Sequence, residues 1–131
     1  RKPPLVTWIT MLALRPGFVE QLDDPATRAA GYERLQLLVR VQLVAVVGVT
    51  LLATFHFARR LGVAGWVAVS VVGSSYLMMR FGRNVTTDVY LMMFVTIAHA
   101  LAAEALLGGR RRWPLVALAG VAAGLGFLCK G

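Results

Sequence analysis

Four apolar runs, each close to the length of a membrane-spanning helix, constrain the fold of this chain more than any other feature. They cover residues 35–58, 63–79, 89–107 and 113–129, separated by short polar or basic loops. A helix needs about 20 apolar residues to cross a hydrocarbon core of about 30 Å. The pattern therefore predicts an all-α, polytopic membrane helix bundle with about four transmembrane helices. The second and fourth runs are the shortest, so we expect them to stand steeply or to reach only partway across.

The composition agrees with a membrane protein. Hydrophobic residues make up 58% of the 131 residues, against about 45–50% in ordinary globular domains. The formal net charge is +8, but the basic residues lie between apolar runs and do not form a stripe on a polar face. This distribution argues against nucleic-acid binding and favours loops beside anionic lipid headgroups. The single cysteine, Cys129, cannot form an internal disulfide.

The charges in the loops predict the orientation of the helices. Arg59 and Arg60 follow the first run, and three arginines at 110–112 follow the third. Loops rich in Lys and Arg tend to stay on the cytoplasmic side. The other side then holds residues 1–34, the loop 80–88 and the chain end near Lys130. That loop also carries arginines, for which the orientation rule gives no reason.

Residues 1–34 are the least apolar part, and we expect them to form an outer-face loop with an interfacial helix, followed by a transmembrane region over 35–131. The two prolines after Lys2 force an extended backbone. The ten residues 5–14 are too few to cross a bilayer, so they predict an interfacial helix with Trp8 at headgroup depth.

Asp88 is a lone carboxylate where a basic loop meets the third apolar run, and the loop also holds Arg80 and Arg83. One interpretation makes Asp88 a base or a substrate-orienting group and the arginines a clamp for phosphate. The other makes Asp88 a first-turn residue that favours the helix dipole by about 0.3–1 kcal/mol, with Thr86 or Thr87 as the cap. The residues alone leave both open.

Three further charged residues have two interpretations each. Lys2 either holds an ammonium group at the depth of lipid phosphates or only extends toward the headgroups. Arg40, near the outer end of the first run, either extends in the same way or pairs with an anion. Glu104, one turn from a cytoplasmic helix end, reaches either water or a loop arginine.

The remaining motifs point to packing and not to soluble-enzyme chemistry. Gly120 and Gly124 have the GxxxG spacing that lets another helix approach closely, although such spacing is common in membrane helices. His56 and His99 have no second ligand at a suitable spacing, so we expect no metal site. No Gly-rich phosphate loop and no Gly-x-Ser-x-Gly motif is present.

Several short motifs, taken in order along the chain, resemble segments of polytopic glycosyltransferases of the GT-C superfamily. The branch is that of dolichyl-phosphate-mannose protein mannosyltransferases and aminoarabinose (lipid A) transferases. The segments are Lys2-Pro3-Pro4-Leu5 followed by Trp8, Arg40, Ala58-Arg59-Arg60-Leu61-Gly62, Arg83 through Thr87-Asp88, and Gly120 through Gly131 with Cys129 where threonine is usual.

The resemblance implies an enzyme of the plasma (inner) membrane that takes a sugar from a polyprenyl-phosphate carrier on the outer face. It passes the sugar, with inversion, to a lipid or protein acceptor, and we expect no cofactor. By resemblance, Lys2 contacts the carrier phosphate with help from Arg83, and Asp88 is a second active-site carboxylate. The family's principal catalytic aspartate lies upstream of the Lys-Pro-Pro segment, so we expect this chain to be an inactive piece of a larger protein. Many members have an acidic residue where this chain has Arg1, and this departure argues against a metal site at that position.

Two other classes of protein remain as alternatives. In a transporter or channel segment, Asp88 and the arginines would line a permeation path, with polar residues near mid-bilayer at broken helices. A transferase would instead place Asp88 and Lys2 at a cavity on the outer rim. In a purely structural membrane subunit, the loop 80–88 would tolerate substitution.

Overall fold

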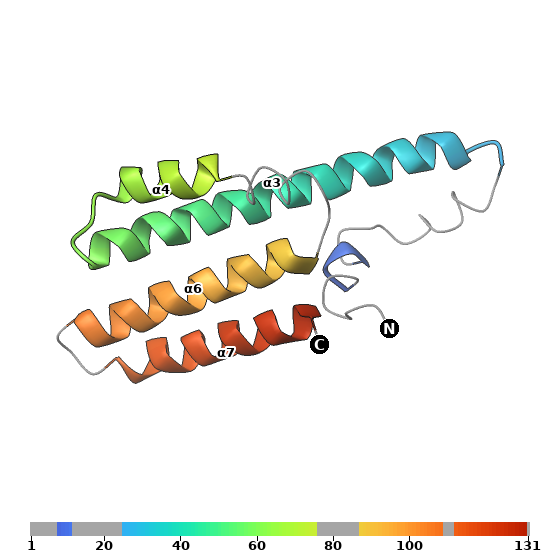
Figure 1. The fold of residues 1–131 in the computed structure, drawn as a ribbon. Helices are drawn as coiled ribbons and strands as arrows, with labels where there is room; N and C mark the ends of the chain where they lie inside the picture. Colours follow the sequence, from blue (N-terminus) through green and yellow to red (C-terminus); the bar gives the residue numbers. More distant parts are fainter. Residues whose placement is uncertain (1–7, 12–24, 76–86, 109–111, 131) are drawn as a thin grey trace.

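The computed structural model is built from helices (Figure 1). It describes residues 8–11, 25–75, 87–108 and 112–130. The four long helices are α3 (Arg28–Arg60), α4 (Gly65–Ser74), α6 (Thr87–Leu107) and α7 (Trp113–Lys130), and residues 8–11 add a single helical turn. All regular structure in the described ranges is helical, which confirms the predicted all-α class.

The four long helices lie side by side in the order α4, α3, α6 and α7 (Figure 1). α6 packs between α3 and α7, and α4 packs against the other side of α3 (Figure 1). α3 and α6 run in the same direction, while α4 and α7 return (Figure 1). The carboxyl ends of α3 and α6 therefore lie at one end of the bundle, and the start of α6 lies near the end of α7 at the other.

Two of the described helices, α3 and α6, are long and apolar enough to cross a membrane by length and composition. α7 is a shorter apolar helix, and α4 has ten residues, a length of about 15 Å. The described residues thus support a membrane helix bundle, with two helices of spanning length where the sequence predicted about four. The described helix in the predicted span 63–79 ends at Ser74, because Ser75 has extended backbone angles (φ −62°, ψ 138°).

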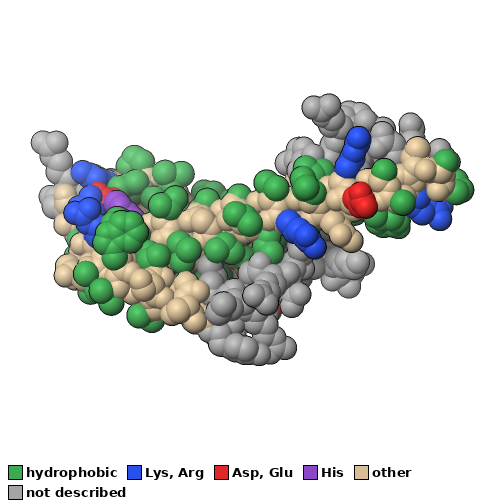
Figure 2. Space-filling model, turned by 90° about the horizontal axis from the view of Figure 1, so that it is seen from above, with side chains coloured by type: hydrophobic (Ala, Val, Ile, Leu, Met, Phe, Trp, Pro, Cys, Tyr) green, Lys and Arg blue, Asp and Glu red, His purple; other side chains and the backbone are tan. Residues whose placement is uncertain are grey.

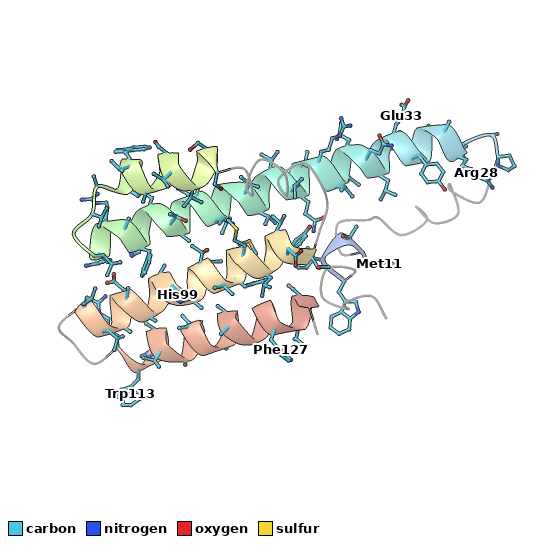
Figure 3. All side chains as sticks on the ribbon, viewed as in Figure 1. Met11, Arg28, Glu33, His99, Trp113 and Phe127 are labelled. Carbon is cyan, nitrogen blue, oxygen red and sulfur yellow. The ribbon has the colours of Figure 1, made fainter. Side chains whose placement is uncertain are left out.

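α3 begins earlier than the apolar pattern predicted, because residues 28–34, expected in the outer loop, form its first two turns. Its 33 residues correspond to about 50 Å at 1.5 Å per residue, which exceeds a hydrocarbon core of about 30 Å. The part of α3 that carries Arg28 and Glu33 extends beyond α6 and α7 (Figure 3). We call this part the α3 extension.

The turn from α3 to α4 has a glycine-dependent cap. Gly62 has a positive φ of 77°, which glycine adopts without steric cost. Its N–H donates to the carbonyl of Arg59, and the N–H of Val63 donates to the carbonyl of Ala58. This pair of bonds is the Schellman motif that commonly ends helices. The motif, with the basic residues just before it, explains why α3 stops at Arg60.

The close approach of α6 and α7 is centred on Gly126. A Cβ atom built there would lie 3.3 Å from Cβ of Phe94 and 3.5 Å from Cδ1 of Leu91. At Gly120 and Gly124, the two glycines of the GxxxG spacing, no described atom lies within 4 Å of such a Cβ. The glycine-mediated contact is therefore made by Gly126, and not by the pair that the sequence singled out.

This difference predicts unequal effects of two matched substitutions. We expect Gly126→Val to lower the free energy of unfolding by about 1–3 kcal/mol, because the added side chain overpacks α6 against α7. Gly120→Val introduces the same β-branched residue into the same helix where the described structure leaves space, so its effect should stay near 0.5 kcal/mol. Thermal midpoints in detergent would compare them, and equal losses would contradict the packing at Gly126.

Candidate functional site

Asp88 lies in the first turn of α6, where the sequence predicted it. The next two residues, Val89 and Tyr90, are buried and belong to a cluster with Leu43 and Val46 of α3 and Cys129 of α7. Side chains from three helices therefore pack together next to Asp88. Packing of this kind holds the first turn of α6, which carries Asp88, against α3 and α7.

The turn at residues 8–11 lies at this same end of the bundle, beside the start of α6 and the end of α7 (Figure 1). Ile9 packs against the buried cluster below Asp88, while Trp8 and Met11 are exposed. One side of the turn thus contacts protein, and its aromatic residue faces outward. This arrangement fits the predicted interfacial helix, of which only residues 8–11 are described.

Helix rise places Arg40 near the same end. Arg60 and Glu104 are in contact at the opposite end, and they provide a common reference level for the parallel helices α3 and α6. At 1.5 Å per residue, Asp88 lies about 24 Å from this level and Arg40 about 30 Å. The Arg40 residue is exposed. The structure thus brings a cation of α3 to the Asp88 end of the bundle, about one turn further out.

Two polar residues that the sequence analysis did not assign to the site also lie at this end. Tyr90 is 1% exposed, and its side chain lies beside Gln42 of α3. Gln42, like Arg40, is a polar residue within the first apolar run, and its polarity is the signal that could have identified it. Their contact links α3 to the start of α6, because Tyr90 lies two residues after Asp88.

The predicted phosphate-binding residues Lys2 and Arg83 lie outside the described residues, as does Arg80. Their grouping with Asp88 therefore stays a prediction. The backbone of α7 runs to Lys130, and its neighbour Cys129 belongs to the cluster below Asp88. Lys130 thus lies at the Asp88 end, as the loop charges predicted.

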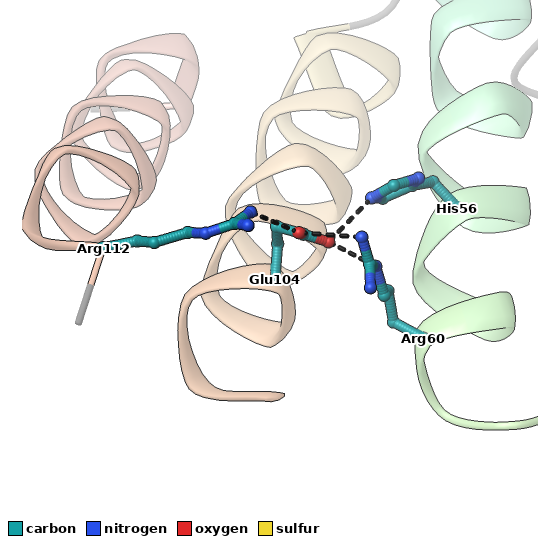
Figure 4. A network of polar contacts seen from close by, with 4 residues as sticks. All are labelled: His56, Arg60, Glu104 and Arg112. Atoms are coloured by element: carbon teal, nitrogen blue, oxygen red, sulfur yellow. Dashed lines mark hydrogen bonds and ion pairs between the residues drawn. The ribbon is translucent and has the colours of Figure 1, made fainter. Parts of the chain in front are cut away.

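A network of charged residues joins the helices at the opposite end of the bundle (Figure 4). Glu104 of α6 is 8% exposed. Its Oε1 accepts hydrogen bonds from Nη2 of Arg60 and Nη1 of Arg112, both at 2.8 Å, and its Oε2 pairs with Nε of Arg60. His56 Nε2 lies 3.3 Å from the same Oε2. Glu104 therefore joins α3 and α6 to the residue that precedes α7.

This network confirms that Glu104 reaches a loop arginine, and it brings the two basic loops to one end. Opposite charges that are partly shielded from water attract more strongly than exposed pairs. His56 was not expected here, although its spacing of four residues from Arg60 places both on one face of α3. His99 instead contacts the carbonyl of Val95 through Nδ1 at 2.7 Å. Within the described ranges, no three His, Cys, Asp or Glu residues are grouped as metal ligands would be.

Comparison with protein families gives a match to the model for dolichyl-phosphate-mannose-protein mannosyltransferases over residues 28–131. The chain belongs to this mannosyltransferase family. The matched region begins with the first residue of α3 and includes Asp88 and the Glu104 network. Comparisons with curated proteins and with solved structures gave no match.

Membership of the mannosyltransferase family confirms the resemblance to GT-C glycosyltransferases and points to glycosyltransferase activity in a membrane protein. It favours this class over the transporter and the structural subunit. The position of Asp88 agrees, because it lies at an end of the bundle and not in the middle of a helix. The match does not include Lys2 or the turn at 8–11, so their part in the site belongs to the proposal below.

Proposed function

We propose that this protein takes part in transferring a sugar from a polyprenyl-phosphate carrier to a lipid or protein acceptor at the outer face of the plasma (inner) membrane. The observation that carries the proposal is the family match over 28–131. The position of Asp88 supports it, since this carboxylate lies at the end of the bundle opposite the basic loops. Basic loops favour the cytoplasmic side, so Asp88 would face outward.

The proposed reaction is a substitution at the sugar carbon that is bonded to phosphate. The acceptor oxygen forms a bond to this carbon, the bond from the carbon to the phosphate oxygen breaks, and the carrier phosphate leaves with the electron pair. The acceptor also loses a proton, which a carboxylate can receive. Cations stabilise the negative charge that develops on the leaving phosphate.

We assign these tasks to the residues that the family resemblance singles out. Asp88 orients the sugar or the acceptor or accepts the proton, and Lys2 contacts the carrier phosphate with help from Arg83. The first turn of α6 suits a carboxylate, because helix N-termini favour negative charge. The buried cluster that anchors this turn suits an orienting role, since catalytic groups must be held in place.

A transfer assay with the full-length protein in membranes, a labelled polyprenyl-phosphate mannose and a range of acceptors tests this function. We expect Lys2→Ala to raise the donor KM by about tenfold, because one charge-assisted contact with phosphate is lost. Arg28→Ala, which removes a cation from the α3 extension, should leave the donor KM unchanged. An unchanged donor KM in Lys2→Ala would argue against phosphate contact, and no transfer from any polyprenyl-phosphate sugar would refute the function.

A further inference from the structure

A groove between α3 and α6 leads toward the Glu104 network. It has a volume of about 320 Å³ and lies open along one side of the two helices. Its lining is apolar apart from two residues at its end, and comprises Val49, Leu52, Ala53, His56, Ile97, Ala100, Leu101 and Glu104. Seven residues separate the two ends of the lining on each helix, a length of about 10 Å. The groove therefore lies alongside the apolar part of the bundle and ends at a polar mouth.

The mouth of the groove carries an excess of positive charge. Arg60 and Arg112 share one carboxylate, that of Glu104, so the three groups together have a net charge of +1. The side chains of Arg60, Arg112 and His56 are still 43%, 46% and 54% exposed. Arg60 directs two of its five N–H donors to Glu104 and Arg112 directs one. Donors thus remain at the surface for an anion.

The surface around this mouth combines the two chemical features of a phospholipid site. Figure 2 shows basic, acidic and histidine side chains gathered at one end of the bundle, with apolar side chains next to them along the helices. Basic pockets between transmembrane helices at the cytoplasmic side suit anionic lipid headgroups.

We infer that this groove binds an anionic phospholipid of the cytoplasmic leaflet, with the phosphate held by Arg60, Arg112 and His56 and an acyl chain lying between α3 and α6. The charge of the mouth selects an anion, and the apolar lining selects a lipid over a free ion. The site lies at the opposite end of the bundle from Asp88, so it does not depend on the proposed catalytic role.

Lipid retention tests this inference. The full-length protein would be reconstituted in nanodiscs of phosphatidylcholine, alone or mixed with phosphatidylglycerol, and the lipid that stays bound after extraction counted by native mass spectrometry. We expect selective retention of phosphatidylglycerol, reduced about tenfold in Arg60→Gln/Arg112→Gln, because two charge-assisted contacts are lost. The control Arg28→Gln/Arg34→Gln removes two arginines from the α3 extension and should retain it. Equal retention by both double variants would overturn the inference.

Two further variants keep the test decisive if the arginine variant fails to fold. Glu104→Gln leaves both arginines and removes their competing anion, so phosphatidylglycerol should be retained at least as well as in the wild type. Loss of retention in this variant would show that the lipid depends on the intact network and not on the cations, and would overturn the site.

Ala53→Phe fills the groove and should reduce retention, whereas Ala45→Phe, at an exposed position of α3, should not. Equal retention of phosphatidylglycerol by these two variants would exclude the groove as the site of the acyl chain.

A last comparison separates a lipid from other occupants. Inorganic phosphate added to the protein in detergent should not raise the thermal midpoint, whereas phosphatidylglycerol should, because a ligand that binds only the folded state stabilises it. Equal stabilisation by both would identify a site for a free phosphate ion instead. If phosphatidylglycerol were neither retained nor stabilising, the inference would be wrong. The groove would then be better explained as a packing surface for another protein helix.

Discussion

Asp88→Asn is expected to lower sugar transfer by the full-length protein by about 100-fold or more, while the protein still inserts normally. Asparagine keeps the size of the side chain, but it can neither accept a proton nor carry negative charge toward the substrate. Removing a group that transfers a proton in the transition state costs about 10²–10⁴-fold in rate. Turnover in a membrane transfer assay and the amount of folded protein would be measured together.

The same experiment separates the two interpretations that the sequence left open for Asp88. If the carboxylate only favours the helix dipole, its loss should lower stability by about 0.3–1 kcal/mol and leave turnover near the wild-type value. Glu33→Gln is the matched control, because it neutralises an exposed carboxylate on the α3 extension. Wild-type turnover in Asp88→Asn would refute a catalytic or orienting role.

Glu104→Lys is expected to have the largest effect on stability. The substitution places a third cation against Arg60 and Arg112 at a position that is 8% exposed. Breaking a buried ion pair costs about 3–5 kcal/mol, and the lower end applies here because both arginines are about half exposed. We therefore expect the free energy of unfolding to fall by about 3 kcal/mol, measured by denaturation in detergent.

A charge exchange provides the control for this prediction. Combining Glu104→Arg with Arg60→Glu restores an ion pair between α3 and α6, so the double variant should be more stable than either single variant. Recovery should be incomplete, because Arg112 then loses its partner. Glu33→Lys makes the same change on the α3 extension and should alter stability by about 0.5 kcal/mol or less. If the two single variants were additive in the double variant, the network would not couple the helices.

The sequence predicted the helices best where polarity changes abruptly. The start of α6 beside Asp88 and the start of α7 at Trp113 were placed within two residues, because a polar loop meets an apolar run at each. The start of α3 was placed at residue 35 instead of Arg28, because residues 28–34 are charged and were assigned to a loop. An apolar run marks only the part of a helix that contacts lipid. The polar residues of a helix that continues beyond the lipid resemble those of a loop.

The arrangement of side chains was less predictable than the helices. The sequence showed that Glu104 lay near basic loops, but His56 joined the network only through the packing of α3 on α6. The role of Gly126 also required the structure, since the distance to Phe94 distinguishes it from Gly120. The grouping of Lys2 with Asp88 depends on contacts between distant segments, which no local pattern determines.

In the proposed function, the α3 extension would limit how substrates approach Asp88. In the proposed orientation, the basic end of this helix of about 50 Å lies at the cytoplasmic boundary, and the helix would project roughly 20 Å beyond a hydrocarbon core of about 30 Å. This projecting part is a continuous helix that extends past the first turn of α6 (Figure 3). A bulky acceptor would therefore have to arrive from the side away from α3, while the donor lipid would enter laterally from the bilayer.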